Sequence, residues 1–176
     1  FVFANPTGPL HIGHTRWAAL GDAIARLLRA SGADVTAEYY VNDAGNQMNV
    51  FADSVLARLH GRDVPAGGYP GAYVQELADA VALEHPDVRE LTDEAARPVV
   101  REAAYRLQMQ DIKNTLAAFD VHFDVFTSEQ TLHDSGAIEQ AVQRLRAQGH
   151  VEDREGAVWL KTTDFGDDKD LSLIHI

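Results

Sequence analysis

The amino-acid sequence predicts an α/β fold with a small parallel sheet. Two short runs rich in β-branched and aromatic residues, at 1–3 and 34–41, have the composition of strands. A stretch with apolar positions at helical spacing separates them, which is the pattern of a right-handed βαβ unit with parallel strands. A later region, 61–120, has mainly helical periodicity, so we expect a helical insertion there. The predicted fold class is therefore an incomplete Rossmann-like parallel sheet with a helical insertion.

The first helix is predicted over about 12–31. Its apolar positions begin at Trp17 and Leu20, and Gly32 is a typical C-cap. We expect both Trp17 and Leu20 to lie in the core. The remaining predicted elements, in chain order, are helices at about 44–60, 71–84 and 94–119, a strand at 121–126, a helix capped by Ser135 that runs to about 148, and a hairpin at 151–161.

The turn between the first strand and the first helix is the most informative part of the chain. Residues 4–14 read ANPTGPLHIGH, with Pro and Gly concentrated before the helix begins. A helix N-terminus attracts phosphate, and His11 and His14, three residues apart, share one helical face. Gly13 would let a flat ring lie close to the backbone. The pattern predicts a nucleoside triphosphate site in which the histidines stabilise transfer at the α-phosphate; the alternative is two histidines that only cap the helix.

A second polar cluster follows the second predicted strand. Residues 42–47 read NDAGNQ, and both strands should end at the same edge of the sheet, where ligands bind in such folds. Asn42 or Asp43 could instead cap the next helix. We therefore expect one site at this edge, with capping as the alternative for one of the two residues.

Composition excludes several classes of protein. The 176 residues carry a net charge of −12, include no cysteine and are 45% hydrophobic. Disulfides and thiolate metal sites are excluded, and no apolar run is long enough to span a membrane. An acidic segment is not expected to grip a nucleic-acid backbone itself. The aspartates of the loop 162–170 are expected to be solvated, and no metal site is predicted.

Three strings resemble the class I aminoacyl-tRNA synthetases, and bacterial arginyl-tRNA synthetase in particular. They are NPTGPLHIGH at 5–14, which contains the "HIGH" signature, YYVNDAGNQ at 39–47, and FDVFTSE at 123–129. The resemblance covers about 1–170, roughly the first half of the catalytic domain, and implies a HUP-type nucleotide-binding fold. It also implies ATP-dependent activation of arginine to arginyl-adenylate and transfer to tRNA(Arg), with ATP, accompanied by Mg²⁺, as a substrate.

The resemblance also implies roles for individual residues. His11 and His14 would be catalytic, and Asn5 would hold the α-amino group of arginine. The ATP-binding set would be Gly8, Pro9, His11, Gly13 and His14, and the arginine-binding set Asn5, Asn42, Asp43 and Gln47. Phe3 stands where the family usually has a serine that contacts the amino acid, so this contact is expected to differ.

The resemblance carries expectations about the whole protein. We expect domains at 1–60 (first βαβ half), 61–120 (helical insertion) and 121–170 (continuation with a hairpin), and a non-native tail at 171–176. The chain starts inside an apparent strand without methionine, so we expect an earlier start. The protein would be a cytoplasmic monomer that contacts tRNA mostly through regions outside this chain, and the chain alone is expected to be inactive. Two alternatives are a His-x-Gly-His nucleotidylyltransferase, such as a pantothenate-synthetase-like enzyme, and a non-catalytic nucleotide-binding module.

Overall fold

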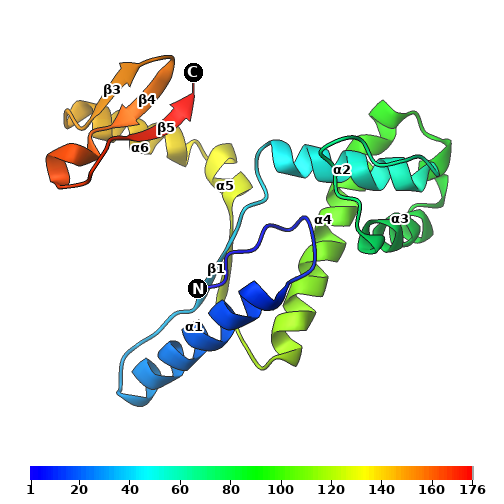
Figure 1. The fold of residues 1–176 in the computed structure, drawn as a ribbon, viewed down its shortest axis with the longest axis horizontal. Helices are drawn as coiled ribbons and strands as arrows, with labels where there is room; N and C mark the ends of the chain where they lie inside the picture. Colours follow the sequence, from blue (N-terminus) through cyan, green and yellow to red (C-terminus); the bar gives the residue numbers. More distant parts are fainter. Residues whose placement is uncertain (176) are drawn as a thin grey trace. The chain divides into compact units, whose positions relative to one another are not determined.

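The chain forms two compact units, Phe1–Gln130 and Thr131–Ile176, in a computed structural model that describes residues 1–175 (Figure 1). The first unit contains most of the helices and the parallel strands, and the second contains an antiparallel sheet. Each unit is described by itself below. Among the described residues, no helix is both long and apolar enough to cross a membrane.

Three helices and a 3-10 turn build the larger core of the first unit. These are α2 (Asn46–Leu59), α3 (Ala72–Glu84), η1 (Pro86–Glu90) and α4 (Asp93–Ala118), and α2 packs on both α3 and α4 (Figure 1). The side chains they bury are mostly aliphatic, which is how amphipathic helices gain stability from tertiary packing. Its buried members are Met48, Phe51, Val55, Leu56, Leu59, Val74, Ala78, Val81, Val88, Ala96, Val100, Ala103 and Ala104. The predicted helices of this region are confirmed to within one or two residues.

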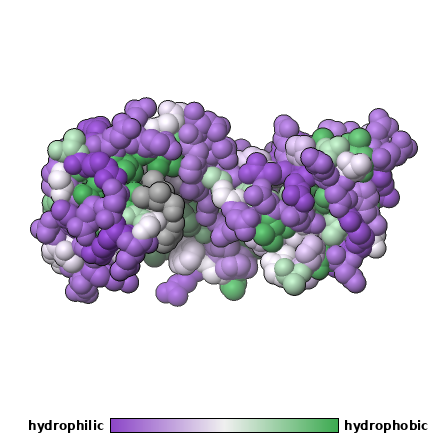
Figure 2. Space-filling view, turned by 90° about the horizontal axis from the view of Figure 1, so that it is seen from above, coloured by the Kyte–Doolittle hydropathy of each residue, from purple (hydrophilic) through white to green (hydrophobic). Residues whose placement is uncertain are grey.

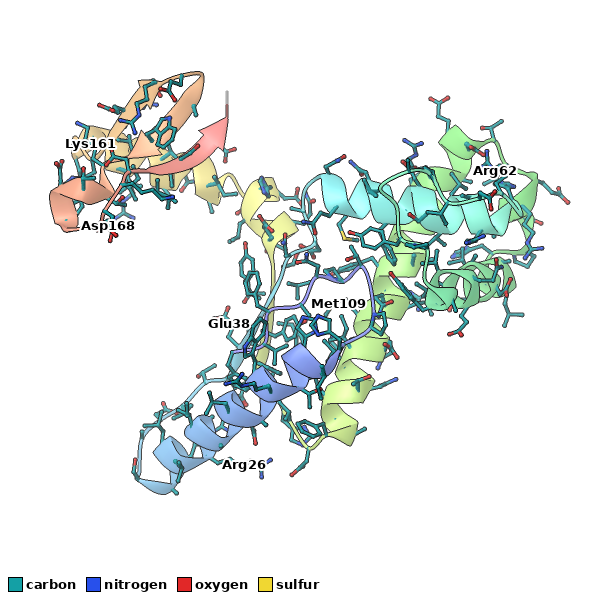
Figure 3. The ribbon with its side chains drawn as sticks, viewed as in Figure 1. Arg26, Glu38, Arg62, Met109, Lys161 and Asp168 are labelled. Carbon is teal, nitrogen blue, oxygen red and sulfur yellow. The ribbon has the colours of Figure 1, made fainter. Side chains whose placement is uncertain are left out.

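A second core lies between α1 (Ile12–Ala30), the parallel strands and the later part of α4. Strand β1 (Glu38–Val41) pairs in parallel with β2 (Val125–Ser128). Met109 of α4, labelled in Figure 3, belongs to this core. Its other buried members are Val2, Ala4, Ala18, Tyr39, Val41, Ile112, Leu116 and Val121. The predicted combination of a helix with a small parallel sheet is confirmed.

The predicted partner of β1 was wrong. Residues 1–3 form no strand, and β1 pairs with β2 instead. Val2 is buried while Phe1 and Phe3 are exposed, so these residues alternate as in a strand. They do not form the backbone hydrogen bonds that would pair them with a neighbouring strand. Three residues supply few backbone groups for pairing, and most strands are longer. The third strand was also placed too early: it begins at Val125, not at 121.

Helix α1 occupies the predicted span but buries a different face. Trp17 is 49% and Leu20 60% exposed, so the prediction that both lie in the core was wrong. The buried positions are Ala18 and Ala25. Gly21 lies between them, and a Cβ there would come within 2.0 Å of the Phe1 ring. Small residues at three- and four-residue spacing let this face approach the N-terminal segment closely, and the larger apolar residues point away from it.

The second unit is a three-stranded antiparallel sheet accompanied by helix α6 (Ala137–Ala147). Strands β3 (Val151–Arg154) and β4 (Ala157–Leu160) form the predicted hairpin, and β5 (Leu171–His175) pairs with β4. Glu155 and Gly156 both have positive φ, as a two-residue type I′ turn requires. A short 3-10 helix, η2 (Thr162–Phe165), lies between β4 and β5.

The start of the last helix also differs from the prediction. A short helix, α5 (Glu129–Asp134), comes first, and α6 begins after Gly136 rather than after a Ser135 cap. Gly136 has a left-handed conformation, which a glycine adopts without strain.

Hydrophilic residues cover most of the face shown in Figure 2, and hydrophobic residues gather in small patches on it.

Candidate active site

A cleft of about 550 Å³ opens beside the N-terminus of α1. It lies where the turn 4–11 and the end of β1 come together, which is the edge that the sequence predicted. Six of the predicted site residues line it: Asn5, Gly8, Pro9, His11, His14 and Asn42. Residues expected to meet ATP and residues expected to meet arginine therefore share one cleft, but Gly13, Asp43 and Gln47 are not among the residues that line it.

The two histidines cap α1 and face the cleft at the same time. The Gly13 N–H donates to His11 Nδ1 at 3.1 Å, and the His11 N–H donates to His14 Nδ1 at 3.2 Å. This is a reciprocal capping box that satisfies two amides at the helix start. A ring nitrogen that accepts a hydrogen bond carries no proton, so each neutral ring carries its proton on Nε2. Capping therefore leaves an Nε2–H donor on each ring for a ligand.

The electrostatics favour a neutral His14. The two rings stack with their centroids 3.8 Å apart. Partial burial lowers the pKa of His14 below its usual value, and the charge of His11 lowers it further. Two adjacent imidazolium ions at the positive end of a helix would repel each other. An incoming polyphosphate would supply the negative charge that this place attracts.

Three amide side chains form a connected group at the end of β1. The Asn5 Nδ2 donates to Gln47 Oε1 at 2.7 Å, and the Asn42 Nδ2 donates to Asn5 Oδ1 at 3.0 Å. Asn5 belongs to the turn, Asn42 follows β1, and Gln47 lies in the first turn of α2. Gln47 does not line the cleft itself, but its side-chain oxygen accepts the hydrogen bond that orients Asn5. The network fixes the orientation of the Asn5 amide, which lines the cleft.

Asp43 lies apart from this group. It is 7% exposed, and its carboxylate accepts hydrogen bonds from the Tyr105 hydroxyl at 2.7 Å and the Gln130 N–H at 2.9 Å. It lines a smaller, separate cavity with Tyr105 and Gln130. Burial, together with the hydrogen bond to Asp43, raises the pKa of Tyr105 well above its usual value. These bonds connect the end of β1 to α4 and to the start of α5, and a role of Asp43 toward arginine stays a prediction.

Four further residues line the cleft that sequence reasoning did not select: Phe3, Thr7, Tyr69 and Tyr73. Tyr69 and Tyr73 come from the region between α2 and the first turn of α3. Only three-dimensional contact brings them to the turn. Phe3, already identified as a departure from the family pattern, is exposed and stacks on Tyr40 with centroids 5.7 Å apart.

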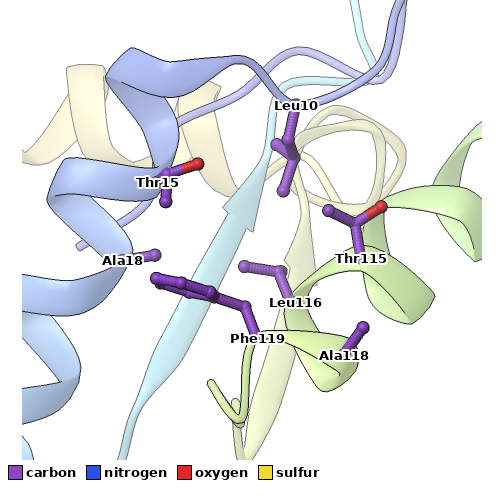
Figure 4. A pocket seen from close by; sticks show the side chains of 7 residues that line it. All are labelled: Leu10, Thr15, Ala18, Thr115, Leu116, Ala118 and Phe119. Carbon is purple, nitrogen blue, oxygen red and sulfur yellow. The ribbon is translucent and has the colours of Figure 1, made fainter.

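A second cavity, of about 250 Å³, lies between α1 and the C-terminal end of α4. Figure 4 shows the Phe119 ring pointing toward Ala18, with Leu10 above and Thr15 on the first turns of α1. Its lining is mostly apolar and contains none of the predicted site residues. It is therefore not part of the candidate active site.

Comparisons with known proteins agree with this geometry. The family described as "tRNA synthetases class I (R), catalytic domain" matches residues 1–64, which hold the turn, the histidines and the amide group. Arginine–tRNA ligases from Micrococcus luteus and Paenarthrobacter aurescens are 96% and 76% identical to this chain over 175 residues, 99% of the chain. The chain spans about a third (32%) of the length of these curated relatives.

Solved structures give the same result. An arginyl-tRNA synthetase structure from Campylobacter jejuni matches 99% of this chain and 39% of its own, with a TM-score of 0.89 and 33% identity. The Thermus thermophilus arginyl-tRNA synthetase, at 23% identity and a TM-score of 0.66, shares the fold over 99% of this chain and 32% of its own. Fold and site thus resemble part of the catalytic region of class I tRNA synthetases. Within that class, the chain is similar over nearly its whole length to about a third of the arginine–tRNA ligases named above.

Proposed function

We propose that the full-length protein containing this chain is an arginine–tRNA ligase. It activates arginine with ATP and then transfers the arginyl group to tRNA(Arg). The observation that carries the proposal is the cleft in which the paired histidines and the Asn5 amide group stand together, in a chain 96% identical to an arginine–tRNA ligase. The nucleotidylyltransferase alternative has no comparable support, since the relatives named above are arginine–tRNA ligases or arginyl-tRNA synthetases.

The first step joins arginine to AMP. A carboxylate oxygen of arginine attacks the α-phosphorus of ATP, the bond from that phosphorus to the bridging oxygen breaks, and pyrophosphate leaves with the electron pair. Negative charge grows on the phosphate oxygens during this displacement. The Nε2–H groups of His11 and His14 would donate to those oxygens, and the α1 N-terminus adds its partial positive charge. Most of the catalysis is positioning and electrostatics.

The remaining residues of the cleft would bind and orient the two substrates. Gly8, Pro9 and Gly13 would admit ATP close to the backbone. Asn5, oriented by Gln47 and Asn42, would accept a hydrogen bond from the α-amino group of arginine. Asp43, which does not line the cleft, would act indirectly: its hydrogen bonds to the Tyr105 hydroxyl and the Gln130 N–H would hold the end of β1 in place.

Mg²⁺ would enter as part of the ATP substrate. The residues that line the cleft include no carboxylate, so the phosphates themselves would be the main ligands of Mg²⁺ here.

We further propose that the parallel pair β1–β2 belongs to an incomplete Rossmann-like sheet. We also propose a monomeric cytoplasmic enzyme that contacts tRNA mainly through regions outside this acidic chain.

Arginine-dependent exchange of pyrophosphate into ATP, measured in the presence of tRNA(Arg), tests the proposal in the full-length protein. We expect exchange with arginine and not with lysine. Replacement of either His11 or His14 by Ala should lower kcat by about 10²- to 10³-fold, the usual cost of removing a donor to developing charge. His122→Ala, at an exposed histidine outside the cleft, is the matched control. Absence of arginine-dependent exchange in the wild-type protein would contradict the proposal, and the 176-residue chain alone should show none.

A further inference from the structure

Two tyrosine hydroxyls hold the backbone of the turn that precedes α1. The Tyr39 hydroxyl, from β1, donates to the Ala4 carbonyl at 3.0 Å. The Tyr73 hydroxyl, from the first turn of α3, donates to the Thr7 carbonyl at 2.7 Å. The first bond fixes the beginning of the turn from the side of the sheet. The second fixes its later part, next to Gly8, from the side of the helical region.

Tyr73 is tightly enclosed, both at its hydroxyl, where it meets the turn, and at its ring, where it meets the residues before α3. Thr7 is only 6% exposed. A Cβ at Gly8 would lie 3.1 Å from the Tyr73 hydroxyl oxygen, and a Cβ at Gly71 would lie 2.5 Å from the Tyr73 ring. Two glycines therefore give this ring its space, one on the turn and one directly before α3. Burial raises the pKa of Tyr73, which keeps the hydroxyl protonated as a donor.

The position of Tyr73 is set by the large helical core. Its ring packs against the cluster built from α2, α3 and α4, and its neighbour Val74 is fully buried there. The loop before α3 is fastened to α2, because the Tyr69 N–H donates to the buried Ser54 hydroxyl at 3.0 Å. The helical region thus presents one fixed donor to the turn.

We propose that Tyr73 is a positioning residue of the ATP site, through which the helical region sets the place of Thr7, Gly8 and Pro9. The inference rests on the function proposed above. It predicts different effects on the two substrates, because different side chains hold the parts of the turn that would meet them. The Gly8–Pro9 part depends on Tyr73. Asn5 is held by Gln47 and Asn42, and Ala4 is held by Tyr39. Loss of the Tyr73 hydroxyl therefore weakens ATP binding and leaves arginine binding unchanged.

The test is Tyr73→Phe in the full-length protein, with the dissociation constants of ATP and arginine measured separately by calorimetry. The phenyl ring keeps its packing, and only the donor is lost. We expect ATP to bind about fivefold more weakly, the size of one net hydrogen bond, and arginine to bind as in the wild type. Gln75→Ala, which removes an exposed hydrogen bond on the same helix, should change neither constant.

A double-mutant cycle with Gly8→Ala gives a second readout. The added methyl group meets the Tyr73 hydroxyl in the wild type, whereas with phenylalanine the nearest ring atom lies at an ordinary contact distance of 3.4 Å. We expect the double variant to bind ATP no more weakly than Gly8→Ala alone. Equal ATP affinity of Tyr73→Phe and wild type, or additive effects in the cycle, would overturn the inference. A protein that binds ATP with this pattern but shows no arginine-dependent exchange would refute the proposed function instead.

Discussion

Tyr39 connects the parallel sheet to the turn 4–11 before α1 through a single buried hydroxyl. Its side chain is fully buried and contacts the rings of Phe123 and Phe126. Burial raises the pKa of Tyr39 from its usual value of 10.0 to about 12. The folded protein therefore holds this proton at a pH where the unfolded chain has lost it.

This difference predicts a loss of stability in alkali that depends on Tyr39. A folded-state pKa above the unfolded value contributes stability fully below about pH 10, and the contribution is lost as the pH rises toward about 12. Urea unfolding of the wild type and Tyr39→Phe should give a difference in unfolding free energy of about 1 kcal/mol at neutral pH. The difference should shrink above pH 10. A difference that stays constant up to pH 12 would contradict the assignment.

At the scale of residues, the sequence revealed the groups that belong to one continuous motif. His11 and His14 were predicted because a turn before a helix has a defined chemistry, and Asn5 because the string around it resembles a known family. Tyr73 was not, because its partner Thr7 is 66 residues away and nothing near Tyr73 in the sequence indicates the contact. Asp43 was predicted to be near the ligand, and its hydrogen bonds to Tyr105 and Gln130 could only come from the fold.

At the scale of elements, α4 is the helix on which both cores of the first unit depend. Its earlier residues belong to the core with α2 and α3, and its later residues pack under β1 and α1. Arg26, labelled in Figure 3, adds a bond from α1 to the turn after α4, where it donates to the Asp120 carbonyl at 2.6 Å. Helix α4 thus connects the two cores of the first unit, and α1 is fastened to the turn that follows it.

The loop between α2 and α3 offers a test of how one side chain fastens an element. Ser54 is fully buried, donates to the Val50 carbonyl at 2.7 Å and accepts from the Tyr69 N–H. Ser54→Ala leaves that N–H without its partner, which should lower the unfolding free energy by about 1–3 kcal/mol. Urea unfolding measures the change. The control Ser31→Ala loses an exposed bond at the end of α1 and should cost less than about 0.5 kcal/mol, and equal effects of the two variants would contradict the role of Ser54.

Helical periodicity predicted the spans of α1 through α4 well, because spacing and capping are local properties. It did not predict which face of α1 is buried. Both Trp17 and Ala18 lie on the helix, and only the close approach of the N-terminal segment selects the small residues. The strands were predicted less well, since pairing between β1 and β2 joins residues that are far apart in the sequence.

At the scale of the whole molecule, one side of α1 presents apolar residues to solvent. The apolar residues on the exposed side of α1 are Trp17, Leu20, Ile24 and Leu27, the last of them 70% exposed. Their spacing places them on one stripe. Contiguous exposed apolar patches of this kind favour association.

We therefore expect the 176-residue chain to self-associate at micromolar concentration. The variant Leu20→Lys/Leu27→Lys should be monomeric in sedimentation velocity and should bind less of a hydrophobic dye. Leu83→Lys changes a leucine on α3 that is 83% exposed and lies outside the stripe, so it should associate like the wild type. A wild-type chain that stays monomeric, or a Leu83 variant that behaves like the double variant, would refute the role of the stripe.

The exposed side of α1 has a consequence for incomplete copies of such a chain in cells. A polypeptide that contains α1 without a partner for this stripe would present apolar side chains beside His14, since the His14 and Trp17 rings lie 5.9 Å apart. Chaperones and proteases recognise exposed apolar segments, so such a polypeptide would be cleared quickly.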